Sequence, residues 1–145
     1  MLPKNVLFDA DVFISYLIGD SLFEHSLKAI ECVVAGSTVA YVSSEIYDDI
    51  VSMLRSNNVP LSKVVEFMEA LSKIPHKPLP LNPEIVVQAL KYYMKHGGPR
   101  KLHYFDTYHV ATAKHYNLPL LTSDKYIINH SAQLGIQTID LRTVK

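Results

Sequence analysis

The sequence predicts one α/β domain, residues 1–145, in which helices cover both faces of a central parallel β-sheet. Short apolar runs that end in polar residues alternate with longer segments whose apolar residues recur at helical spacing. That alternation is typical of βαβ units and of a parallel sheet. A length of 145 residues is enough for one domain with its own core, and no repeat or linker divides the chain.

The expected strands are short and rich in apolar or β-branched residues: residues 6–8, 38–42, 77–81, 119–122 and 136–141. Four prolines lie within or beside the third of these, which favours an edge position for it. The expected helices lie between or after the strands: residues 12–18, 22–35, 45–56, 61–74, 84–96, 104–116 and 125–134. Glycines at 19 and 36 and the proline at 60 mark helix boundaries. The connections between parallel strands should be right-handed.

Composition excludes several classes of protein. Hydrophobic residues make up 48% of the chain and charged residues 19%, which is typical of a globular protein. The formal net charge is +0, so no overall field attracts nucleic acid. A single cysteine, Cys32, and no signal peptide or apolar stretch of membrane length favour a cytoplasmic protein without a membrane segment. No glycine-rich phosphate loop follows any expected strand, which disfavours dinucleotide and P-loop binding.

Three carboxylates lie where strands end or helices begin. Asp9 follows the first strand, Asp124 follows the fourth, and Asp106 falls in the first turn of its helix. Taken singly, each is well explained as a helix cap or a first-turn acid. The carboxyl ends of parallel strands share one edge of the sheet, so the three acids are expected to converge there. They would repel and raise one another's pKa, which a hard cation such as Mg²⁺ or Mn²⁺ relieves.

The helix at residues 45–56 carries three further acids, Glu45, Asp48 and Asp49. On a helical wheel, Asp49 lies roughly 85° from the centre of the apolar stripe, Glu45 about 125° and Asp48 about 175°. Asp49 is therefore expected at the boundary between core and solvent, where it can reach a metal above the sheet. Asp48 is expected to be a solvated surface acid.

Four segments together resemble the motifs of PIN-domain nucleases, in the order of that family and over most of the chain. They are Val-Leu-Phe-Asp-Ala-Asp at 6–11, residues 43–50, Phe-Asp-Thr-Tyr-His-Val-Ala-Thr-Ala at 105–113 and Leu-Thr-Ser-Asp at 121–124. Two of the motifs depart from the usual pattern. The family usually has Asp-Thr-Asn in the first motif, where this chain has Asp-Ala-Asp, and Glu in the second, where Asp49 aligns.

The resemblance implies a Rossmann-like fold, one or two Mg²⁺ or Mn²⁺ ions, and hydrolysis of RNA phosphodiesters. Asp9 and Asp106 are then the principal metal ligands, Asp124 and Asp49 bind a second ion or act through water, and Asp11 adds a ligand or orients one. Two ions about 4 Å apart would clamp the attacking and leaving oxygens. Arg100 and Lys101 are candidate phosphate contacts, although an ordinary solvated loop explains them equally well.

The resemblance also has implications for partners. Its most populous branch is the toxin half of VapBC toxin–antitoxin pairs, which implies an antitoxin protein as partner. Related PIN domains are commonly dimers. A homodimer is also favoured by the apolar content of the helices at 22–35 and 61–74, which exceeds what one sheet face needs.

Two other functions stay open on the sequence. Asp9-Ala10-Asp11 resembles the Asp-x-Asp of haloacid-dehalogenase-like phosphatases, but Phe13 stands where that family has Thr or Val, and too few residues follow the second motif. A PIN fold that binds RNA or protein without catalysis is the other alternative.

The sequence predicts no zinc site at its regularly spaced histidines, His103, His109 and His115, which recur every six residues. Six residues turn a helix by 600°, so these three side chains share no face. His109 lies three residues after Asp106 and can touch the site, but a packing or surface role is expected for it.

Overall fold

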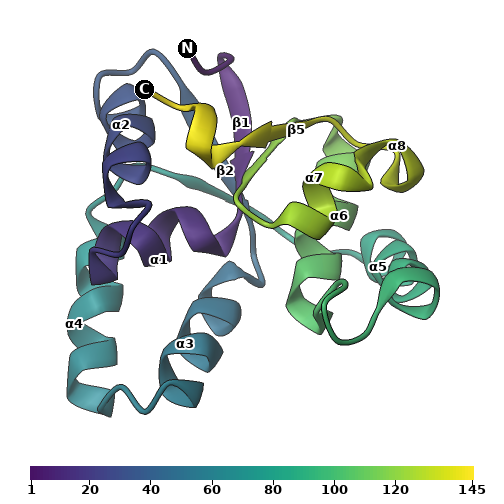
Figure 1. Ribbon diagram of the computed structural model, residues 1–145, viewed down its shortest axis with the longest axis horizontal. Coiled ribbons are helices and arrows are strands. Elements are labelled where there is room, and N and C mark those ends of the chain that lie inside the picture. Colours follow the sequence, from purple (N-terminus) through teal and green to yellow (C-terminus); the bar gives the residue numbers. More distant parts are fainter.

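The computed structural model describes residues 1–145, and at its centre is a five-stranded sheet in the order β3-β2-β1-β4-β5 (Figure 1). Every neighbouring pair of strands is parallel. The strands are β1 (Asn5–Phe8), β2 (Val39–Ser43), β3 (Lys77–Leu79), β4 (Leu120–Thr122) and β5 (Thr138–Asp140). All five expected strands are therefore present, and the proline-rich β3 is at an edge as predicted.

Helices cover both faces of the sheet and form two layers with separate cores. The helices are α1 (Ala10–Ile18), α2 (Phe23–Val34), α3 (Ile46–Ser56), α4 (Leu61–Ser72), α5 (Pro83–His96), α6 (Tyr104–Tyr116), α7 (Lys125–Asn129) and α8 (Ser131–Leu134), and a 3₁₀ turn, η1 (Leu141–Thr143), follows β5. Figure 1 shows α1 to α4 on one side of the sheet and α5 to α8 on the other. Along β1, Val6 and Phe8 enter the first core and Leu7 enters the second, because successive side chains of a strand point to opposite faces.

The predicted helix at residues 125–134 was wrong in one respect, because the structure contains two short helices there. The backbone of His130, with φ −110° and ψ 17°, departs from helical geometry between α7 and α8. Its ring stacks on Tyr126 at 3.9 Å between centroids, and its Nδ1 donates to the Tyr126 carbonyl at 2.9 Å. The backbone N–H of His130 donates to the same carbonyl at 3.0 Å, so the helical ladder of α7 reaches His130 and ends where the backbone of that residue departs from helical geometry.

The order of the strands creates a switch point between β1 and β4. The chain runs from β1 to β2 and β3 on one side, then crosses to β4 and β5 on the other. Loops that leave β1 and β4 therefore diverge, and crevices at such points are where α/β sheets bind ligands. Asp9 follows β1 and Asp124 follows β4 by two residues, so both acids lie at this point. No helix has the length and apolar character needed to span a membrane.

Candidate metal site

The predicted acids converge on one pocket at the carboxyl ends of β1 and β4. It is a cavity of about 160 Å³, lined by Asp9, Ala10, Asp11, Ile14, Asp49, Met53, His103, Asp106 and Asp124. All five acids singled out in the sequence are among these residues. We refer to this cavity as the acidic pocket.

Asp9 is buried, and both of its oxygens are hydrogen-bonded. Oδ1 accepts from the backbone N–H of Ala10 at 2.7 Å, at the start of α1. Oδ2 accepts from the hydroxyl of Thr122 at 2.7 Å, at the end of β4. The capping interpretation is therefore correct, and the same carboxylate also ties the two central strands together. Each oxygen keeps a second lone pair with which it can bind a cation.

Asp11 is the second residue of α1, two positions after Asp9, and it binds the turn after β4. Its Oδ2 accepts from the backbone N–H of Ser123 at 2.7 Å and from the Ser123 hydroxyl. Arg142 holds the turn from the other side, because its Nη2 donates to the Ser123 carbonyl at 3.0 Å. The second oxygen of Asp11, Oδ1, is buried and has no hydrogen-bond partner. An unpaired buried carboxylate oxygen is costly, and a cation would satisfy it.

Asp106 and Asp124 also begin helices, as predicted. Asp106 Oδ2 accepts from the backbone N–H of His103 at 2.9 Å at the start of α6. Asp124 Oδ1 accepts from the N–H of Ile127 at 3.1 Å at the start of α7. In each case the other oxygen has no protein partner. Capping fixes one oxygen of each acid and leaves the other free for a ligand in the pocket.

The middle helix contributes Asp49, as the wheel predicted. Asp49 lines the acidic pocket with its side chain 17% exposed, whereas Asp48 is exposed and Glu45 does not line the pocket. Asp49 Oδ2 lies 2.7 Å from Nε2 of His109, which is fully buried on α6. The same nitrogen is 4.0 Å from Asp9 Oδ1.

His109 is fully buried, as a packing role requires, and it also reaches the site, which its position three residues after Asp106 had left open. Asp106 is three residues earlier and therefore almost one turn away on the same helix. A polar ring so close to an inward-facing acid is a signal for a site residue.

Arg100 and Lys101 lie outside the pocket. Both are exposed in the loop between α5 and α6, and Arg100 has a positive φ of 62°. Neither lines the acidic pocket, but His103, at the end of the same loop, does. The loop therefore presents its two cations close in sequence to the pocket rim, and their contact with a phosphate stays a prediction.

Burial and mutual repulsion shift the ionisation of the pocket. Burial raises the pKa of Asp9, Asp11 and Asp106, each to about 7, and neighbouring carboxylates contribute to each rise. For His109, burial lowers the pKa, but the hydrogen bond with Asp49 and the charges of the surrounding acids outweigh it, so the net pKa is raised. Near neutral pH the metal-free pocket therefore holds protons that a cation would displace.

The donor set fits a hard divalent cation. Free carboxylate oxygens converge from the ends of two strands and the starts of three helices, and the buried Oδ1 of Asp11 lacks any partner. Oxygen donors of this kind suit Mg²⁺ and Mn²⁺. Ligand atoms of Asp9, Asp49 and His109 also lie within 4.8 Å of one another.

The fold and pocket define an α/β domain with acids gathered at the switch point of a parallel sheet. The sequence matches the profile of the PIN domain over residues 6–132, and the chain therefore belongs to the PIN domain family. The matched range includes every acid of the pocket and leaves no support for a haloacid-dehalogenase-like phosphatase. A search of curated protein sequences finds no match.

Several solved structures have a similar fold. A toxin–antitoxin complex from Klebsiella pneumoniae is similar with a TM-score of 0.63 and 16% identity, over 94% of this chain and 97% of that chain. VapBC2 from Rickettsia felis, bound to a promoter DNA fragment, has a TM-score of 0.69 and 8% identity, over 94% of this chain and 98% of that chain. VapBC-1 from nontypeable Haemophilus influenzae has a TM-score of 0.62 and 15% identity, over 96% of this chain and 99% of that chain. Identities this low show the shared fold alone.

Proposed function

We propose that this PIN domain is a metal-dependent ribonuclease that hydrolyses RNA phosphodiester bonds. The observation that carries the proposal is the convergence of five acids, four of them with an oxygen that has no protein partner, on one small pocket at the switch point. A bare acidic pocket would repel a phosphodiester. A divalent cation held there supplies positive charge, polarises the phosphoryl oxygens and eases the ionisation of water near neutral pH.

Each acid has a part in this proposal. Asp9 and Asp106 are the principal ligands of Mg²⁺ or Mn²⁺, with Asp9 held by Ala10 and Thr122 and Asp106 held by His103. Asp49 and Asp124 bind a second ion or act through water. Asp11 offers its unpartnered Oδ1 and holds the turn that carries Asp124.

Outside the pocket, we infer that Arg100 and Lys101 contact RNA phosphates, because they are exposed cations on the loop that ends at His103. We further infer that the chain is the toxin of a cytoplasmic toxin–antitoxin pair, with an antitoxin protein as partner. What supports this is the fold shared with the proteins of the Klebsiella and Haemophilus complexes.

We also infer that the chain forms a homodimer. Exposed apolar side chains remain on α4, where Leu61 is 61% and Val65 is 51% exposed, and on α5, where Met94 is 87% exposed. The expectation of surplus apolar surface on α2 was wrong in extent, because most of its apolar residues pack into the core and Val34 alone is a large exposed one. Light scattering at tens of micromolar tests the dimer, and a monomer mass would contradict it.

The deciding experiment measures cleavage of single-stranded RNA labelled with a fluorophore, with Mn²⁺, with Mg²⁺ and with EDTA. Wild type should cut RNA with either cation and be silent in EDTA. A phosphomonoester, p-nitrophenyl phosphate, serves as the second substrate and should not be hydrolysed. RNA bound but uncut in the presence of Mn²⁺ would instead favour a catalytically silent binding module.

A further inference from the structure

We propose that His109 is a positioning residue that holds Asp49 in place for the metal and does not itself bind the metal. The inference rests on the metal site proposed above. It starts from the 2.7 Å hydrogen bond between His109 Nε2 and Asp49 Oδ2, which joins α6 to α3 across the pocket. The residues come from segments 60 positions apart in sequence, so the bond fixes how the two helices present their acids.

The other ring nitrogen decides the role of the histidine. His109 is 0% exposed, and its Nδ1 is buried with no hydrogen-bond partner. The proposal concerns the neutral ring in the metal-bound protein, which carries one proton, on one nitrogen or the other. An ionised Asp49 can only accept, so the 2.7 Å contact requires the proton on Nε2, and a proton on Nδ1 would leave a buried donor unpaired. The favoured tautomer is therefore Nε2–H, which donates to Asp49.

This tautomer rules out direct ligation by His109 in the arrangement seen. A nitrogen that carries a proton has no lone pair for a metal, although Nε2 is near enough to Asp9 and Asp49 to share a cation with them. Asp49 needs such a partner, because its side chain is partly exposed at the edge of α3 and could turn towards solvent. With Oδ2 held by His109, Oδ1 is the atom left for the metal.

Nuclear magnetic resonance of wild-type protein with ¹⁵N-labelled histidine tests the tautomer without any mutation of the site. In the Mg²⁺-bound protein, long-range proton–nitrogen correlations should show His109 protonated at Nε2 and not at Nδ1. The His109→Gln spectrum assigns the signal among the seven histidines. A proton on Nδ1 of the Mg²⁺ complex would overturn the proposal.

Metal binding measured by calorimetry separates positioning from ligation. His109→Leu removes the donor and should weaken Mn²⁺ binding at least tenfold. His109→Gln places an amide N–H near the position of Nε2 and should stay within about threefold of wild type. His115→Leu, an exposed histidine of the same helix, is the matched control and should bind as wild type does. If His109→Leu and His109→Gln weakened Mn²⁺ binding equally, a donor role for His109 would be contradicted.

Two further measurements complete the test. In the Asp49→Asn background, His109→Leu should weaken Mn²⁺ binding by less than threefold, because the histidine acts through Asp49; full additivity of the two changes would overturn the proposal. Electron spin-echo spectroscopy of bound Mn²⁺ should show no directly coordinated ¹⁴N, and a strong histidine coupling would also overturn it. If wild type binds no Mn²⁺ at all, the proposed metal-dependent function fails instead.

Discussion

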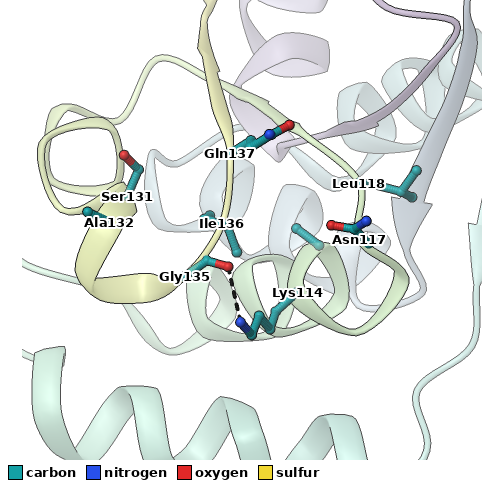
Figure 2. Close-up of a pocket in the computed structure, with 9 residues that line it drawn as sticks. Lys114, Asn117, Leu118, Ser131, Ala132, Gly135, Ile136 and Gln137 are labelled. Atoms are coloured by element: carbon teal, nitrogen blue, oxygen red, sulfur yellow. Dashed lines mark hydrogen bonds between the residues drawn. The ribbon is translucent and has the colours of Figure 1, made fainter.

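Cavities lie at both ends of the sheet, but only one of them has the chemistry of a functional site. At the carboxyl ends of β1 and β4, a cavity of about 160 Å³ gathers five acids. Near the opposite ends of β4 and β5, a hollow of about 390 Å³ is lined by nine residues of α6, α8 and the segments before the strands (Figure 2). The hollow is more than twice as large, yet its one charged side chain, Lys114, already donates to the Gly135 carbonyl at 3.3 Å.

The difference shows that volume does not identify the functional end of this molecule. In the hollow, the charged group is exposed and has a partner within the protein. In the acidic pocket, burial and repulsion raise the pKa of three acids to about 7, and a buried oxygen of Asp11 has no partner. Groups held in an unfavourable state by the fold are the sign of a site whose ligand relieves that state.

The largest expected effect comes from removing a principal ligand. Asp9→Asn or Asp106→Asn should lower cleavage of single-stranded RNA at least a hundredfold, about 2.7 kcal/mol of barrier. Calorimetry should show Mn²⁺ binding that weakens sharply in both variants. Glu24→Gln, an exposed carboxylate on α2, is the control and should change neither. Unchanged Mn²⁺ binding in both site variants would mean that the cation lies elsewhere.

The same Asp9→Asn protein tests the capping role separately. An asparagine can still accept the N–H of Ala10, and the change removes one repelling charge. The metal-free variant should therefore be no less stable than metal-free wild type in urea unfolding. A loss of several kcal/mol would show that Asp9 serves mainly the fold.

The second effect is a dependence of stability on pH that only the acidic pocket should produce. Asp9, Asp11 and Asp106 have an ordinary pKa of 3.8, and burial raises the pKa of each to about 7 in the fold. The folded state then binds more protons than the unfolded state between about pH 4 and 7. Stability from these groups is complete below that window and is lost as the pH rises through it.

In EDTA, the free energy of unfolding should therefore fall by about 2 kcal/mol or more between pH 5.5 and 8, since one pKa unit corresponds to about 1.36 kcal/mol. Saturating Mn²⁺ should flatten this dependence, because the cation replaces the protons. Urea titrations at both pH values measure it. If the metal-free protein instead became more stable towards pH 8, the pKa values of the three acids would not be raised in the fold.

Much of this end of the molecule follows from the sequence. The alternation of strands and helices places Asp9 and Asp124 at strand ends, and the helical wheel selects Asp49 over Asp48, because both arguments use local geometry. The break at His130 escapes such reasoning, since no glycine or proline interrupts residues 125–134 to mark it.

His109 shows a different limit. A wheel gives the direction of a side chain from its own helix but not the identity of the residue that faces it. The bond from His109 to Asp49 depends on how α6 packs against α3, and Arg142 reaches Ser123 only because β5 pairs with β4. Contacts between distant segments come from tertiary packing, and no periodicity in this sequence encodes them.

The third effect sharpens the comparison within one helix. Asp49→Asn should lower ribonuclease activity at least tenfold, about 1.4 kcal/mol of barrier, because Asp49 lines the acidic pocket. The neighbouring Asp48 is exposed, so Asp48→Asn should leave ribonuclease activity nearly unchanged. Single-turnover cleavage at saturating Mn²⁺ measures both. Comparable loss from Glu45→Gln would place the working acid in the first turn of α3 instead.

The smallest effect is expected at the hollow of Figure 2. Lys114 is exposed, and its amine donates to the Gly135 carbonyl from the last turn of α6. An exposed bond of this kind and the favourable position of a cation near a helix end each contribute little in water, so Lys114→Ala should reduce the free energy of unfolding by at most about 0.5 kcal/mol. Its stability should change with pH as wild type does, because none of the strained acids lies at this end of the sheet. If Lys114→Ala instead weakened Mn²⁺ binding or RNA cleavage tenfold, the two ends of the sheet would be coupled, and the hollow would have to be counted as part of the site.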